Sequence, residues 1–342
     1  MASNKDGLTD MPDSSTKRTI VEAFWGSSLP NYQLDSYWDH YRESCEFALR
    51  DQGRHLLIRT HQDILDMVAQ LKSGISRAVI RNSLRSKFTR AHHNEDELLD
   101  RSIDLASTLL LMVDFGDIED GVTSRQRLHW NDPESIRSCI SSHFNQAPLI
   151  SVSDSTKLQR NFNALNLARI AGIDFVPTTN LLDHLRLTNE DTKVYVFHCA
   201  SFLKLQPEDS MLPKNITEET IRTLALLFPQ TLDPSTRQWY RKISTHMSLD
   251  PQLFLCGKLK TANRQIETFS FWRDRLVILK QAFDDSHPQS FSQWFHDRRN
   301  GVQWYTFWVA MVVLGLTLLF GLIQSIEGAI QVWASLRNAE RH

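Results

Sequence analysis

The stretch Trp304–Ile323, WYTFWVAMVVLGLTLLFGLI, holds 20 residues without a charged side chain, and only two threonines among them are clearly polar. As an α-helix it would be about 30 Å long, which is the thickness of a bilayer's hydrocarbon core. Trp304, Tyr305 and Trp308 cluster at its start, where amphipathic rings suit the headgroup region. A core helix of a soluble fold seldom runs so long without a polar face. The stretch therefore predicts one transmembrane helix over 304–323.

The residues after this stretch predict an amphipathic tail over 324–342. At about 100° per residue, one side of the helix gathers polar side chains and another side gathers apolar ones. The polar side holds Gln324, Glu327, Gln331 and Asn338, and the apolar side holds Ile323, Ile326, Ile330 and Trp333. Glu327 is therefore expected beyond the hydrocarbon, because a charge inside the bilayer is costly.

Small side chains recur every four residues along a further stripe, which consists of Thr317, Gly321, Ser325 and Ala329. Such stripes let helix backbones approach closely within a membrane. The stripe predicts homodimerisation through this helix. The alternative is that small residues are merely tolerated against lipid, and the sequence leaves both interpretations open.

Arginines do not decide the orientation of the span, because Arg298 and Arg299 precede it while Arg337 and Arg341 follow it. The polar residues 1–19 lack the apolar core of a secretory signal, and a disordered lead is predicted over 1–30. With 19 residues after the span, insertion would follow synthesis, as for a tail-anchored protein. The amino-terminal bulk would then stay in the cytosol, with the lipid bilayer as a partner. Four widely spaced cysteines fit such a reducing compartment.

Composition and periodicity predict a mainly α-helical protein. Apolar residues make up 41% and charged residues 23% of the chain, close to a globular average, and the net charge is −2. Helical spacing of apolar residues predicts one helical module over 31–145 and a second, mostly helical module over 155–300. The segment NQAPLISVSDSTK between them is rich in turn formers. Val194–Phe197 is the only convincing strand, so the expected β content is minor.

A basic segment over 72–90 contains six lysines and arginines and no acidic residue. Within it, Arg77, Arg81 and Arg85 form an i, i+4 stripe that is a candidate contact face. The favoured interpretation is a solvated face balanced by the acidic helix that follows, over 95–104. The alternatives are contact with anionic lipid or an acidic protein partner, and a recognition helix for nucleic acid, which is the least favoured partner.

No catalytic, cofactor-binding or metal-ligating residue is predicted. The chain contains no glycine-rich phosphate loop, nucleophile elbow or zinc-protease motif. His92 and His93 are metal-capable, but no second pair of ligands stands at a defined spacing from them. The sequence thus favours a non-catalytic, membrane-anchored adaptor or regulatory protein with unidentified protein partners. The alternative is a membrane-associated enzyme with a site assembled from dispersed residues, which a deep polar pocket would indicate.

Three segments carry a resemblance to a known group of proteins. They are FVPTTNLLDHLRL, VYVFHCASFLKLQ and the terminal WYTFWVAMVVLGLTLLFGLIQSIEGAIQVW. Over about its last half, the chain resembles uncharacterised proteins of filamentous ascomycete fungi that carry a carboxy-terminal transmembrane anchor. The resemblance implies a gene in an accessory or subtelomeric cluster linked to hyphal surface and to colony or biofilm morphology. It implies no activity and no catalytic residue.

Overall fold

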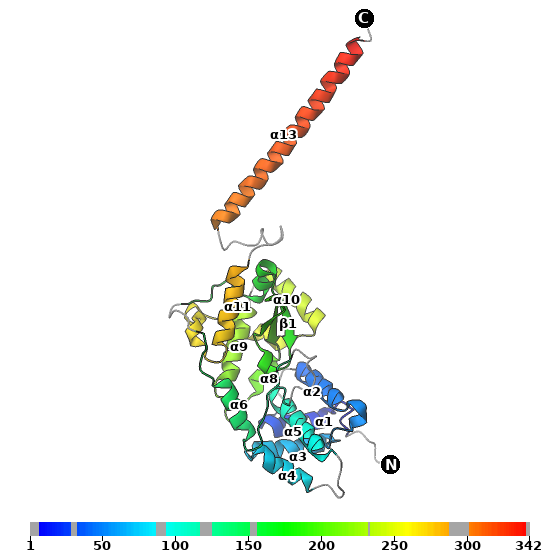
Figure 1. Cartoon of the computed structure of the whole chain (residues 1–342), viewed down its shortest axis with the longest axis vertical. Coiled ribbons are helices and arrows are strands. Elements are labelled where there is room, and N and C mark those ends of the chain that lie inside the picture. Colours follow the sequence, from blue (N-terminus) through cyan, green and yellow to red (C-terminus); the bar gives the residue numbers. More distant parts are fainter. Residues whose placement is uncertain are drawn as a thin grey trace. The chain divides into compact units, whose positions relative to one another are not determined.

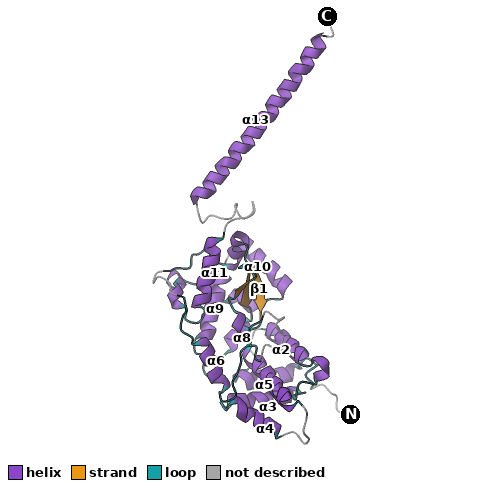
Figure 2. Cartoon of the chain, in the orientation of Figure 1, coloured by secondary structure: helices purple, strands orange, loops and turns teal. Residues whose placement is uncertain are grey.

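The computed structural model describes residues 7–28, 33–86, 94–116, 125–150, 156–231, 233–286 and 301–339. The chain divides into two units. The globular unit comprises Met1–Ala168 and Gly172–Asp285, and the second unit comprises Arg169–Ala171 and Ser286–His342. Helices dominate the described residues and strands are few (Figure 1, Figure 2), which confirms the mainly α-helical prediction.

The first helix, α1 (Ser14–Trp25), lies within the segment predicted to be a disordered lead and corrects that prediction. Its start is capped by Asp13, whose carboxylate accepts a hydrogen bond from the Thr16 amide at 2.8 Å. The helix ends at Gly26, whose φ of 67° is the left-handed conformation that glycine adopts freely. Its buried face consists of Ile20, Val21, Phe24 and Trp25. Burial of this apolar face stabilises the helix despite the polar composition around it.

The next helices are α2 (Asp35–Ala48), α3 (His61–Lys72), α4 (Arg77–Arg85), α5 (Glu95–Leu111) and α6 (Ile136–Phe144), with a 3₁₀ turn η1 (Arg50–Gly53) after α2. Helix α5 is central, because it packs against α2, α3 and α4. Ten of its 17 residues are buried. Tyr37 of α2 donates a buried hydrogen bond to the Leu109 carbonyl of α5 at 3.0 Å. This contact satisfies a buried hydroxyl and fixes α2 against the central helix.

A small sheet is built from β1 (Asp174–Thr178), β2 (Leu187–Thr188) and β3 (Lys193–Phe197) in the order β1-β3-β2. The short helical elements α7 (Ala164–Asn166), η2 (Leu167–Ala171) and η3 (Leu181–Asp183) precede or separate these strands. Strand β3 pairs in parallel with β1, with Phe175 opposite Val194, and antiparallel with β2. The predicted strand is thus the centre of the sheet, and the two edge strands were not predicted.

The remaining elements of the globular unit are α8 (Ala200–Leu205), α9 (Ile216–Leu227), α10 (Pro234–Met247), η4 (Pro251–Leu255), η5 (Thr261–Arg264), η6 (Ile266–Thr268) and α11 (Arg273–Asp285). Helix α9 packs against α8 and η4. Phe202 of α8 stacks on Tyr37 of α2 and meets Trp25 of α1 edge-on, with ring centroids 6.4 and 5.8 Å apart. Helices from 31–145 and from 155–300 therefore share one core within the globular unit.

The described helix of the second unit is α13 (Gly301–Ala339), which is 39 residues long (Figure 1). It contains the predicted span 304–323 and continues without a break through residues 324–339 of the predicted tail. Residues 340–342 of that tail lie outside the described part of the chain.

Candidate functional site

Helix α13 is the most prominent candidate for a functional surface. Its segment Trp304–Trp333 is long and apolar enough to cross a membrane, and an 18-residue window within it has a mean hydropathy of 2.3 and is not buried inside the protein. Side chains that a soluble fold would bury are open, for example Val309 at 62% and Phe320 at 59% exposure. An apolar surface of this extent is normally covered by lipid or by another protein. The prediction of one apolar helix with the length of a membrane span is confirmed.

The apolar segment extends ten residues past the predicted end at Ile323. Its 30 residues correspond to about 45 Å of helix, close to the thickness of a bilayer with its headgroups. At one end, the Trp304 ring centroid lies 5.2 Å from that of Tyr305 and 6.0 Å from that of Trp308. Glu327 stands about 35 Å along the helix axis from Trp304. This distance exceeds the hydrocarbon thickness, so a span that starts at Trp304 would place Glu327 in the headgroup layer.

The small-residue stripe lies along the exposed surface of α13. Thr317 and Ser325 turn their hydroxyls back onto the helix and donate to the carbonyls of Val313 and Gly321 at 2.8 and 2.9 Å. A Cβ atom added at Gly321 would meet no described atom within 4 Å. With its hydroxyls satisfied, the stripe offers a close neighbour a smooth surface. Homodimerisation through Thr317, Gly321, Ser325 and Ala329 stays a prediction.

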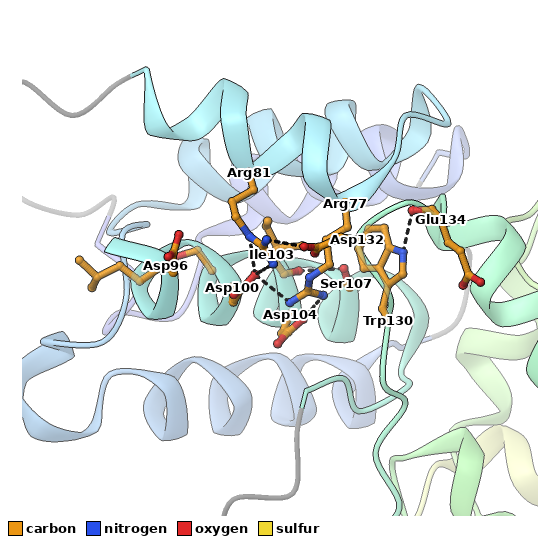
Figure 3. A network of polar contacts seen from close by, with 12 residues as sticks. Arg77, Arg81, Asp96, Asp100, Ile103, Asp104, Ser107, Trp130, Asp132 and Glu134 are labelled. Atoms are coloured by element: carbon orange, nitrogen blue, oxygen red, sulfur yellow. Dashed lines mark hydrogen bonds and ion pairs between the residues drawn. The ribbon is translucent and has the colours of Figure 1, made fainter. Parts of the chain in front are cut away.

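The predicted basic face of α4 lies against α5 and forms an ion-pair network (Figure 3). Arg77 is only 6% exposed. Its guanidinium contacts Asp104 at 2.6 Å and Asp100 at 3.2 Å. Arg81 contacts Asp100 and Asp132, each at 2.7 Å. Asp132 lies 51 residues from Arg81 along the chain, and no local sequence pattern indicates this partner.

Arg85 continues the stripe at the exposed end of α4, where it pairs with Asp96 and lies 3.9 Å from Glu95. All three arginines of the predicted contact face therefore lie against carboxylates of the same fold. The acidic helix that follows thus balances the basic one, as the favoured interpretation has it, but the face is not solvated throughout, because Arg77 is buried. Residues 87–90 of the basic segment, together with His92 and His93, lie outside the described residues.

Burial and neighbouring charges act in opposite directions on the pKa of Arg77. Burial lowers the pKa of its guanidinium, but the carboxylates of Asp104 and Asp100 outweigh burial, so the net pKa is raised. The guanidinium also lies 5.2 Å from the ring centroid of Trp130. The Trp130 indole N–H in turn donates to the Glu134 carbonyl at 2.9 Å. The network thus ties α4 and α5 to the loop before α6.

A cavity of about 580 Å³ opens beside this network. Two arginines and four acidic residues line it, which are Arg77, Arg81, Asp100, Asp104, Asp132 and Glu134. A polar pocket with converging free acids would favour the enzyme alternative. Here arginines hold the carboxylates of Asp100, Asp104 and Asp132 at 2.6–3.2 Å. These carboxylates therefore act as structural partners of the arginines.

No family model, curated protein or solved structure matches this chain. The resemblance to filamentous-ascomycete proteins therefore stays a prediction. What the protein does has to follow from the chemistry of its own side chains.

A histidine and a cysteine adjoin in the core directly after β3. The Cys199 Sγ lies 3.9 Å from the His198 Nε2. Burial lowers the pKa of His198 to about 4 and raises the pKa of the Cys199 thiol well above its usual value. Burial thus disfavours the thiolate, which is the form in which a thiol attacks. The Nδ1 of His198 accepts a hydrogen bond from the Asp250 amide at 3.3 Å, which is a structural role.

A buried carboxylate on α9 also serves the fold. Glu219 is 5% exposed and accepts hydrogen bonds from the backbone amides of Ser270, Phe271 and Trp272 at 2.7–2.8 Å. Burial raises the pKa of Glu219, and the three amide hydrogen bonds act in the opposite direction.

Within the described ranges, no group of three or more His, Cys, Asp or Glu side chains is placed to hold a metal ion.

Proposed function

We propose that this chain is a membrane-anchored, non-catalytic adaptor or regulatory protein that acts through contacts of its globular unit. The observation that carries the proposal is the open apolar surface of α13 over Trp304–Trp333. Exposure of apolar side chains to water costs free energy, and this cost is removed when lipid surrounds a helix of this length and composition.

The globular unit supports action by contact. Its buried carboxylate Glu219 and its buried pair His198 and Cys199 are engaged by the fold, and their perturbed pKa values have burial as the first cause. The four cysteines of the chain are all free thiols. Unpaired thiols fit a reducing compartment, which supports an orientation with the globular unit in the cytosol. The resemblance to fungal proteins motivates a narrower proposal, an influence on hyphal surface, colony or biofilm morphology.

Membrane extraction of the full chain tests the anchor. A fluorescent protein fused before Met1 should sediment with membranes after alkaline carbonate treatment. The double variant Leu314→Arg/Leu318→Arg should release it, because each arginine near the bilayer centre costs about 3 kcal/mol or more. The matched control Leu314→Ala/Leu318→Ala should stay with the membrane.

Protease treatment of sealed vesicles tests the orientation in the same preparation. The fused fluorescent protein should be digested if the globular unit faces the cytosol. A full chain that is soluble before any extraction would overturn the anchor, since another protein would then cover α13. A fusion that is protected from protease would overturn the orientation and leave the anchor intact.

A further inference from the structure

A groove of about 680 Å³ on the globular unit is lined by residues of α10, of the η4 turn and of the segment just after it. Its apolar part is an aromatic pair. The rings of Tyr240 and Phe254 stack with centroids 4.9 Å apart and planes 28° apart. The Tyr240 hydroxyl donates to the Pro229 carbonyl at 3.1 Å, which fixes this ring. Leu255, at 54% exposure, adds an open apolar side chain to the same lining.

The polar part of the groove is basic. Arg237 and Arg241 are one turn apart on α10, and Lys258 comes from the segment after η4. No acidic residue is among the described residues that line the groove. From Asp233 to Glu267 the chain carries six lysines and arginines and three acids, which are Asp233, Asp250 and Glu267.

Asp250 does not offset the basic groove. Asp250 is 1% exposed. Its carboxylate accepts hydrogen bonds from the amides of Ser201 and Gln252 at 2.7 and 2.8 Å. Its charge is thus directed into the core, and the groove keeps a positive field.

The groove differs from the arginine network on α4. There, each arginine of the stripe faces a carboxylate. In the groove, the side chains of Arg241 and Lys258 are exposed and make no ion pair or hydrogen bond with any other described residue. Asp233 at the start of α10 interacts electrostatically with Arg237, whereas Arg241 and Lys258 form a surface that is complementary to anions.

An anionic surface lies within reach if α13 is anchored as proposed above, and the inference rests on that proposal. Only 18 residues, 286–303, separate the end of the globular unit from Trp304. A chain of this length spans at most about 65 Å. The bilayer that holds α13 would thus be present at a high effective concentration. Its anionic headgroups complement the basic rim, and exposed apolar side chains suit the interface below them.

We propose that this groove docks on the anionic phospholipid headgroups of the membrane that holds α13, with Arg237, Arg241 and Lys258 against the headgroup oxyanions and Leu255 in the interface. Each cation near an anionic leaflet strengthens association about fivefold, so Arg241 and Lys258 together supply about 25-fold before screening. The occupant is the lipid surface itself.

Hydrogen exchange of the full chain in nanodiscs tests the groove. Backbone amides of α10 and of Pro251–Lys258 should exchange about tenfold more slowly in discs with phosphatidylserine than in discs of phosphatidylcholine alone. The difference should vanish in 1 M salt, where the screening length is about 3 Å. Arg241→Glu/Lys258→Glu should abolish it. These side chains are exposed and without partners, so exchange in α5 and α9 should stay unchanged.

The matched control is Lys242→Glu/Lys260→Glu, which makes the same charge change in the same segment but outside the groove lining. The control should keep most of the protection. Equal exchange in the two kinds of disc overturns the groove, as does equal loss in both double variants. A third outcome is that acidic discs do not protect the groove amides, whereas a soluble glutamate polymer added to neutral discs does. This outcome overturns lipid docking in favour of an acidic protein partner. Failure of the chain to enter discs is a separate result, which overturns the anchor.

Discussion

Arg81 donates from both Nε and Nη2 to one carboxylate oxygen, the Oδ1 of Asp100, at 3.0 and 2.7 Å. Arg77 reaches the same oxygen through its own Nη2 at 3.2 Å. One acidic side chain of α5 thus holds two arginines from successive turns of α4 (Figure 3). Because the two cations would repel each other without it, Asp100 is central to the packing of α4 against α5.

Removal of Arg77 should destabilise the globular unit strongly. In Arg77→Leu the half-buried Asp104 loses its ion-pair partner at 2.6 Å, and removing one partner of a buried ion pair typically costs about 3–5 kcal/mol. Arg85→Leu is the matched control. The Arg85 side chain is 43% exposed, so its loss should cost less than about 1 kcal/mol. Urea unfolding of both variants measures the difference, and equal losses would contradict a buried network.

Charge reversal of the whole stripe should also act on the fold. Arg77, Arg81 and Arg85 changed together to Glu would set three carboxylates against the acidic face of α5. We expect loss of helical circular dichroism rather than only a weaker contact with a partner. A triple variant with the full helical signal would show that these ion pairs are dispensable, and the basic stripe would again be a candidate contact face.

Glu219 should be intolerant of even a nearly isosteric change. Its Oε1 accepts from Phe271 and Trp272, and its Oε2 accepts from Ser270. In Glu219→Gln an NH₂ group would face at least one of these amides and leave that buried N–H without an acceptor. The free energy of unfolding should fall by about 1–3 kcal/mol as a result. Glu219→Ala should cost more, because all three donors lose their acceptor. Thermal unfolding of both variants checks the order, and a glutamine variant as stable as the parent chain would refute it.

The features that could be predicted from sequence are those set by residues close together in the chain. Helix α13 is recognisable because its apolar residues are adjacent, and a bilayer-length run needs no partner to be identified. The acidic residues of α5 were foreseen as a balance to Arg77, Arg81 and Arg85 because the two helices are consecutive. The apolar residues of α1 also follow the helical period. Because they are few and lie in a mostly polar amino-terminal segment, composition led to the wrong prediction of disorder there.

What escaped prediction depends on residues that are distant in sequence. Strand β1 is five residues long and contains Pro177, which is unusual for a strand. It forms because it pairs as an edge strand with β3, and proline is tolerated at an edge. The basic groove escaped for the same reason. Arg241 and Lys258 are 17 residues apart, and the η4 turn brings them to one lining.

Acid should destabilise the globular unit through its buried histidines. Burial lowers the pKa of both His40 and His198 to about 4, from 6.5. The unfolded state therefore binds more protons between about pH 4 and 6.5, and the free energy of unfolding falls as the pH drops through this range. Each histidine should contribute a loss of about 2 kcal/mol between pH 7 and pH 5. Urea unfolding at the two pH values measures the sum over all shifted groups, which include His184 with a lowered pKa and Glu219 with a raised one.

The variant His198→Asn separates this effect from general acid sensitivity. An asparagine oxygen can accept the hydrogen bond that the Nδ1 of His198 accepts from the Asp250 amide. The variant should lose about 2 kcal/mol of the pH dependence, whatever its stability at pH 7. An unchanged difference between pH 7 and pH 5 would show that the pKa of His198 is not lowered in the folded state.

Two glycines of α13 distinguish a packing stripe from small residues tolerated against lipid. Gly315 and Gly321 both have open space where a Cβ would stand, so leucine at either site leaves the single helix undisturbed. The two positions differ by six residues, which places them about 120° apart around the helix. Gly321 lies on the stripe and Gly315 does not.

If two copies pack through the stripe, Gly321→Leu should weaken their association on the order of tenfold, while Gly315→Leu should leave it unchanged. Energy transfer between differently labelled full chains in vesicles, measured as the chain is diluted with lipid, gives the association directly. Equal transfer in the two variants would show that the small residues face lipid.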